Sequence, residues 1–142
     1  MRFLIAASPD PTAPKNEQPA MPDEKLLEAY MKFNEEMHKA GILVASEGVN
    51  PAGKGARVGV AKGKRKVIDG PFPESKELVG GFYLVDVKSL EEAISWAMRA
   101  PTGLGFDDLL TILPMTNEED LPPEMLALIR RVAPAWSQTF RR

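Results

Sequence analysis

Hydrophobic and polar positions alternate with several different spacings along this 142-residue chain. Short apolar runs typical of β-strands occupy residues 2–7, 42–47, 82–87 and 109–113. The segment that ends at Gly41 carries apolar residues at helical spacing, which predicts a helix that begins near Glu24. A second helix is predicted from Ser89, because Ser89 and Glu92 have the spacing of a capping box.

The order of these elements predicts the fold class. Residues 56–60 and 66–68 predict a β-hairpin that turns at Gly63, and a terminal helix is predicted from residue 120 to Val132, ended by Pro134. Strands and helices in this order form the split βαβ pattern of an α+β, ferredoxin-like fold. Helices cover only one face of such a sheet, and an apolar face in water is unfavourable. We therefore expect a homodimer paired through the other sheet face.

Composition and charge narrow the class of protein. A hydrophobic fraction of 44% and a charged fraction of 27% are ordinary for one soluble domain. The net charge of −2 gives no support to a nucleic-acid-binding protein. No apolar run approaches the ~20 residues of a membrane span, and the first run is too short for a signal peptide. The absence of cysteine fits a reducing compartment, so we expect a cytoplasmic protein without membrane contact.

The segment from Asp69 to Glu77 joins a proline-braced turn to three further ionisable side chains. Glu74 and Glu77 are candidate catalytic groups, because a carboxylate shielded from water can have a raised pKa and act as a general acid or base. Lys76 could hold an anionic group of a ligand. The alternative for these three is a solvated charged loop with a weak surface ion pair. Asp69 is either a turn-forming residue or a ligand contact.

Three further residues are candidate ligand contacts. Tyr30 lies on the apolar face of the first helix, Glu47 ends an apolar strand and Arg57 begins the predicted hairpin. Each has a structural alternative: helix core for Tyr30 and an exposed position for the other two. His38 is the one histidine and has no acidic partners at ligand spacing, so we expect no metal site. The sequence has neither a Walker A loop nor a G-x-S-x-G motif, and we expect no cofactor.

Three segments resemble those of a known family: residues 38–48, 67–77 and 80–100. The motif Asp-Gly-Pro-Phe at residues 69–72 is the most specific part of this resemblance. The chain resembles the DGPF-type members of the YCII-related proteins. The resemblance implies a dimeric α+β barrel, and most members have no established activity. Better-studied relatives are suspected of using a His–Asp pair. That histidine falls near Tyr30 when the helix ends are aligned at Gly41, so this chain departs from the pattern.

The resemblance covers about residues 1–114, which we predict to be the α+β barrel domain, with residues 115–142 as a helical extension. Its apolar stripe and two aromatic residues, Trp136 and Phe140, are predicted to pack on the same subunit, on the dimer partner or over a pocket mouth. We expect the domain to bind a small polar or anionic metabolite between sheet and helices, with cofactor-free acid/base catalysis if it is an enzyme. The alternative is a non-catalytic regulatory or protein-interaction module that uses the extension.

Overall fold

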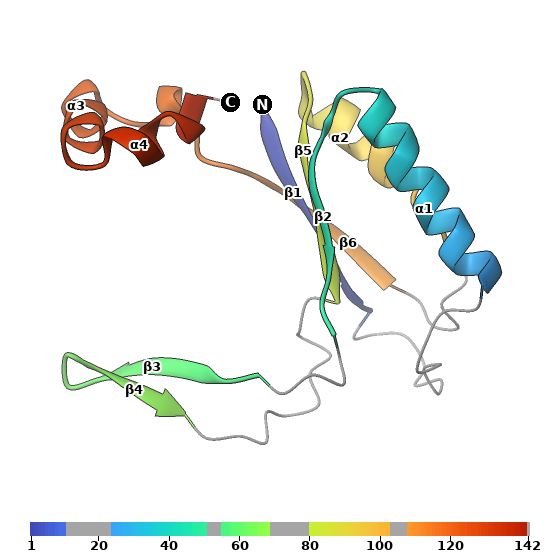
Figure 1. Cartoon of the computed structure of the whole chain (residues 1–142), viewed down its shortest axis with the longest axis horizontal. Helices are drawn as coiled ribbons and strands as arrows, with labels where there is room; N and C mark the ends of the chain where they lie inside the picture. Colours follow the sequence, from blue (N-terminus) through green and yellow to red (C-terminus); the bar gives the residue numbers. More distant parts are fainter. Residues whose placement is uncertain (11–23, 51–54, 69–79, 103–107, 142) are drawn as a thin grey trace.

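The computed structural model describes residues 1–10, 24–50, 55–68, 80–102 and 108–141 (Figure 1). Its strands are β1 (Arg2–Pro9), β2 (Leu43–Gly48), β3 (Arg57–Ala61), β4 (Lys64–Ile68), β5 (Gly81–Asp86) and β6 (Asp108–Pro114). Its α-helices are α1 (Glu24–Lys39), α2 (Leu90–Ala97), α3 (Pro123–Val132) and α4 (Pro134–Ser137). Two short 3-10 helices, η1 (Glu118–Asp120) and η2 (Thr139–Arg141), complete the C-terminal segment.

Four strands form an antiparallel sheet in the order β2-β5-β1-β6. Helices α1 and α2 both lie on one face of this sheet (Figure 1). The strand order and the positions of the two helices are those of the split βαβ pattern. The predicted ferredoxin-like α+β fold is therefore confirmed. Strands β3 and β4 form a separate hairpin, inserted in the chain between β2 and β5.

The core lies between the sheet and the two helices. Phe3, Ile5 and Val85 point to this covered face and are almost completely buried, together with Met37 of α1 and Ala93 of α2. Alternate residues of a strand point to opposite faces, so every second side chain of β1 enters the core. Burying a side chain of this size contributes about 1.5–3 kcal/mol.

The first helix is amphipathic, as its sequence predicts. Leu26, Phe33 and Met37 are buried, and they recur at spacings that place them on one side of a helix. The exposed side carries the i,i+4 ion pair between Glu28 and Lys32, with 3.1 Å between carboxylate and ammonium. Gly41 has a φ of 72°, which suits glycine better than any other residue and ends the helix.

The second helix begins where its capping residues predict. The Ser89 hydroxyl accepts a hydrogen bond of 3.2 Å from the backbone N–H of Glu92. The Glu92 carboxylate accepts one of 2.8 Å from the backbone N–H of Lys88, not from Ser89 as a regular capping box would have it. Both interactions satisfy amide groups at the helix start that would otherwise lack a partner.

The opposite face of the sheet, which we call the open face, remains apolar. Leu4 pairs in register with Leu84 and Leu113, and all three point away from α1 and α2. Leu113 keeps 48% of its surface exposed. The hairpin and the C-terminal helices both project on this side of the sheet (Figure 1).

The terminal helix ends where its sequence predicts: α3 stops at Val132, before Pro134. A separate short helix, α4, was not predicted and begins at Pro134. Proline can begin a helix because at the first helical position it loses no intrahelical hydrogen bond. In the described part of the chain, no helix is both long enough and apolar enough to cross a membrane.

Candidate functional site

Two tyrosines and an aspartate meet at the covered face of the sheet. Tyr83 of β5 is in register with the core residue Ile5, and its ring packs edge-on against Phe33 of α1, with 5.7 Å between ring centres at 89°. Tyr30 lies almost one turn before Phe33 on the same helix and is partly buried. Asp108 begins β6 and interacts electrostatically with both phenols. We call Tyr30, Tyr83 and Asp108 the tyrosine cluster.

The surroundings of the cluster raise the pKa of both phenols, which are protonated at neutral pH in any case. Burial raises the pKa of Tyr83 to about 12, and the negative charges of Tyr30 and Asp108 add to that effect. Burial also raises the pKa of Tyr30, again with a contribution from the Asp108 carboxylate. A protonated phenol donates a hydrogen bond, and a carboxylate accepts one. The cluster therefore combines two hydrogen-bond donors with one anionic acceptor.

Aromatic and polar side chains fix the position of the cluster. Phe33 contacts Trp96 of α2 at 6.4 Å between ring centres, and the Arg99 guanidinium lies 4.5 Å from the Trp96 ring. On the other side of Phe33, the Ser46 hydroxyl of β2 is hydrogen-bonded to the Asn34 side-chain oxygen at 3.3 Å. These contacts tie α1 to both α2 and the sheet, so the rings around Tyr83 have restricted freedom.

Of the seven candidate residues from the sequence, the structure places one in this cluster. Tyr30 is there, whereas Arg57 lies on the exposed hairpin and Glu47 is exposed on β2. The remaining candidates lie outside the described residues, so their predicted roles stay predictions. They are Asp69, Glu74, Lys76 and Glu77.

The position of Glu47 has a specific cause. Counting alternate residues from the core-facing Leu43 would place Glu47 on the covered face. The pairing of β2 with β5 shifts between Leu43 and Ala45, however, and the extra residue of such a bulge reverses the alternation. Ser46 then pairs with Tyr83 and reaches α1, while Glu47 pairs with Phe82 on the open face.

Sequence reasoning missed Tyr83 and Asp108. Tyr83 had a usable signal, because it lies two residues before Val85 in a strongly apolar run and shares its face. A hydroxyl on a core-facing position deserved consideration as a polar contact. Asp108 had no comparable signal, because only the pairing of β6 with β1 brings it to the tyrosines.

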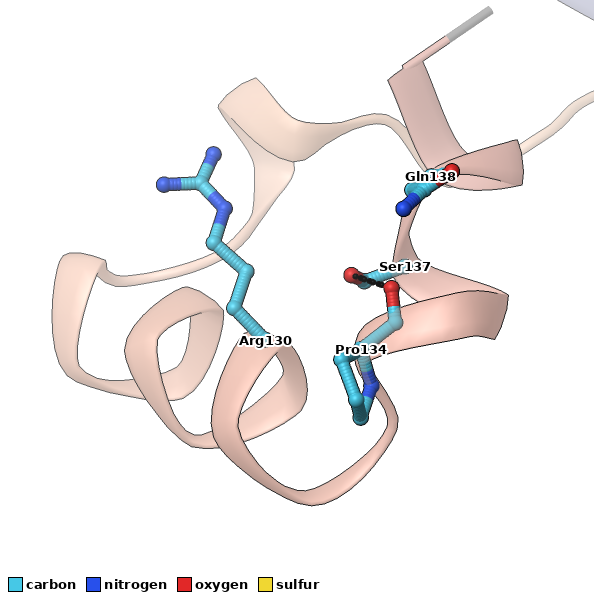
Figure 2. Close-up of a pocket in the computed structure, with 4 residues that line it drawn as sticks. All are labelled: Arg130, Pro134, Ser137 and Gln138. Atoms are coloured by element: carbon cyan, nitrogen blue, oxygen red, sulfur yellow. Dashed lines mark hydrogen bonds between the residues drawn. The ribbon is translucent and has the colours of Figure 1, made fainter.

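A hollow of about 510 Å³ lies in the C-terminal segment, lined by Arg130, Pro134, Ser137 and Gln138 (Figure 2). Two of its polar groups have partners: the Ser137 hydroxyl donates to the Pro134 carbonyl at 3.0 Å, and Arg130 pairs with Glu118 at 3.1 Å. Among the described residues, no group of three or more acidic or histidine side chains is placed to hold a metal ion.

Comparison with known proteins identifies the family. Residues 1–115 match the family model of the YCII-related domain. The chain belongs to the YCII-related family. An uncharacterized protein of Rhizobium meliloti (strain 1021) is 35% identical to it over 75 residues, which are 53% of this chain. The matched region spans 60% of that relative's length.

For this YCII-related protein, the match confirms the family resemblance read from the sequence. The finer DGPF-type assignment depends on Asp69–Phe72, outside the described residues, and stays a prediction. The whole tyrosine cluster lies within the matched range, whereas α3 and α4 lie beyond it.

Proposed function

We propose that this YCII-related protein binds a small polar metabolite at the tyrosine cluster, between α1 and the sheet. The observation that carries the proposal is the meeting of Tyr30, Tyr83 and Asp108 on a sheet face that is otherwise apolar. A few polar groups that converge on an otherwise apolar surface are typical of small-molecule sites, where they orient the ligand.

The charges at the cluster restrict the ligand. Protonated phenols suit a carbonyl, hydroxyl or anionic oxygen, and the Asp108 carboxylate suits a hydroxyl or amine that donates to it. An anionic ligand would also need a nearby cation to offset the negative charge of Asp108, and Lys76 is predicted to be that cation. The aromatic rings of Phe33 and Trp96 suit the apolar part of the same molecule.

The same groups support cofactor-free acid/base chemistry as the catalytic form of the proposal. A phenol that is protonated at neutral pH is a general acid, and the Asp108 carboxylate is a general base. Proton transfer needs the reacting atom within about 2.6–3.2 Å of these groups. Glu74 and Glu77 keep their predicted roles as further acid/base groups.

The experiment is a thermal-shift screen of the full chain against hydroxy acids, keto acids, amino acids and polyols. A ligand at about 100 times its dissociation constant stabilises the folded protein by about 2.7 kcal/mol. We expect a compound whose shift is lost in Tyr83→Phe and in Tyr30→Phe but kept in Ser95→Ala, a control that removes an exposed hydroxyl from α2. Shifts that are unchanged in both tyrosine variants would contradict the proposed site.

We also propose that the protein is a homodimer paired through the open face. Leu109 and Leu113 of β6 remain 43% and 48% exposed there, next to the partly buried Leu4 and Leu84. A twofold axis places such a face against itself and removes it from water in both subunits. Light scattering after gel filtration tests this directly, and a monomer mass over the micromolar range would contradict it.

A second candidate function is a protein-interaction module, favoured by the exposed apolar stripe of α3. Met125, Leu128 and Val132 recur on one side of this helix, and Trp136 follows them. Removal of residues 116–142 separates the two candidates. The interaction module predicts that the truncated chain no longer binds a partner protein. The metabolite-binding protein predicts that the truncated chain keeps its ligand shifts and that no partner protein is lost.

A further inference from the structure

The inserted hairpin has one face that is mostly valine and another that carries most of its basic side chains. In the register of β3 and β4, Val58 pairs with Val67 and Val60 pairs with Arg65, so these four side chains share a face. The other face carries Arg57, Lys64, Lys66 and Ile68 together with the small residues at 59 and 61. The three valines are 57%, 62% and 59% exposed.

Such a hairpin needs a partner surface. A two-stranded hairpin alone is at best marginally stable in water. An exposed row of valines is the part of a hairpin that gains most from burial, because the gain is proportional to the apolar surface removed from water. The described hairpin makes its extensive contacts within itself, between β3 and β4.

The C-terminal segment has a matching surface. Met125, Leu128 and Val132 form an exposed stripe on α3. Residues 118–124 precede this stripe and contain four acidic and no basic side chains: Glu118, Glu119, Asp120 and Glu124. In Figure 1 the hairpin and the C-terminal helices project from opposite ends of the sheet, both on the side of the open face.

We infer that, in a dimer paired through the open face, the α3 stripe of one subunit packs on the valine face of the other subunit's hairpin. This inference rests on the proposed dimer. Two orientations of the twofold axis bring two open faces together. In one, each hairpin meets the partner's hairpin and each C-terminal segment meets its counterpart. In the other, each hairpin meets the partner's C-terminal segment.

Charge selects between these two arrangements. Residues 57–66 contain five basic and no acidic side chains: Arg57, Lys62, Lys64, Arg65 and Lys66. Pairing like segments would bring two such hairpins together, and like charges at an interface oppose association. Pairing unlike segments instead brings the basic hairpin close to Glu119, Asp120 and Glu124. Glu118 already pairs with Arg130 of α3, which also carries Arg131 in its last turn. In a closed dimer of this kind, the contact between a hairpin and a C-terminal segment forms twice.

The absence of cysteine allows a direct test by cross-linking. Val60→Cys and Leu128→Cys chains are prepared separately and also co-expressed with tags of different mass, then treated with a short thiol–thiol cross-linker. We expect the covalent dimer only in the co-expressed sample and only between unlike chains. A dimer of Val60→Cys with itself would overturn the inferred arrangement. No covalent dimer in any sample, with a dimer mass in light scattering, would also overturn it.

Charge reversal provides a second readout without cysteines. Lys64→Glu with Arg65→Glu should raise the dimer dissociation constant at least about tenfold, because opposite charges then become like charges. Adding Glu119→Lys and Glu124→Lys to the same chain should restore most of the affinity. The matched control, Lys25→Glu with Lys32→Glu, makes the same charge change on exposed α1 and should have little effect. Loss without rescue would overturn the charge pairing, and a monomeric parent chain would instead overturn the proposed dimer.

Discussion

The two faces of the central sheet have similar side chains but different surroundings. On the covered face, Phe3 and Ile5 are each 2% exposed, because α1 and α2 lie over them. On the open face, Leu4 lies between these two residues in β1, and Leu84 precedes the buried Val85 in β5. Leu113, which pairs with Leu4, is nevertheless about half exposed. Hydrophobic residues on a strand therefore show which sheet faces are unfavourable in water. The placement of the helices determines which of those faces is buried within the subunit.

The same contrast separates the two proposed activities of the protein. The covered face contains the tyrosine cluster, whose polar groups lie beside aromatic rings and form the proposed small-molecule site. The open face, the hairpin and α3 present apolar surface that only a large partner can bury. The predictions below test this division, from the largest expected effect on stability to the smallest.

The largest effect is expected from truncating the covered face. Phe3→Ala should lower the free energy of unfolding by about 3–5 kcal/mol, because it leaves a cavity beneath the helices. Leu113→Ala on the open face should cost less than about 1 kcal/mol in the monomer. Urea denaturation of both variants at the same low protein concentration measures the difference. Equal losses would show that the two faces are equally covered in solution.

A glycine pair compares the sheet with the inserted hairpin. A Cβ at Gly81 would lie 2.9 Å from the backbone oxygen of Glu47, so Gly81→Ala should destabilise the sheet by about 1–3 kcal/mol. A Cβ at Gly59 would lie 2.8 Å from the end of the flexible Ile68 side chain, which can move. Gly59→Ala should therefore stay within about 0.5 kcal/mol. Thermal denaturation tests the pair, and a larger loss at Gly59 would contradict the comparison.

A smaller effect on stability is expected at the N-terminal cap of α2. Ser89→Ala removes the hydroxyl that accepts from the Glu92 amide and should cost about 1 kcal/mol. Ser89→Asp keeps a capping oxygen and should recover most of that loss. Chemical denaturation compares the three proteins. No loss in the alanine variant would show that packing of the helix, rather than its cap, determines its stability.

The effect that is smallest at neutral pH concerns the tyrosine cluster. Below the ordinary tyrosine pKa of about 10, both folded and unfolded states hold the Tyr83 proton. As the pH rises from about 10 to about 12, the unfolded state loses it first, so the stability contributed by the raised pKa of Tyr83 is progressively lost. The chain has only two tyrosines, Tyr30 and Tyr83, so tyrosinate absorbance reports on this cluster alone.

The matching variant for this titration is Asp108→Asn. Removing the carboxylate should lower the pKa of both tyrosines, because the charge that opposes their ionisation is lost. Tyr83→Phe should leave one titration step, that of Tyr30. Two tyrosines that titrate together near pH 10 in the folded parent chain would contradict the described burial of the cluster.

How far the sequence predicted the site depended on the kind of information needed. Helical periodicity placed Tyr30 on the inward side of its helix, where it is partly buried, while its role as a ligand contact stays a prediction. Strand alternation alone would place Glu47 on the core-facing side of β2. A single bulge residue reverses that alternation, and nothing in the sequence marks the bulge. Asp108 required the pairing of β6 with β1, a contact between residues about a hundred positions apart.

The sequence by itself determined the element order, the cap at Ser89 and the alternation that fills the core. These depend on interactions between near neighbours, or on period-2 and period-3.6 patterns that each segment carries alone. Tertiary structure alone decided that two phenols and a carboxylate share one face and that the hairpin and C-terminal segment project on the other. The physical reason is that such groupings depend on strand register and on the direction in which the chain leaves each strand. Both are set by contacts throughout the fold.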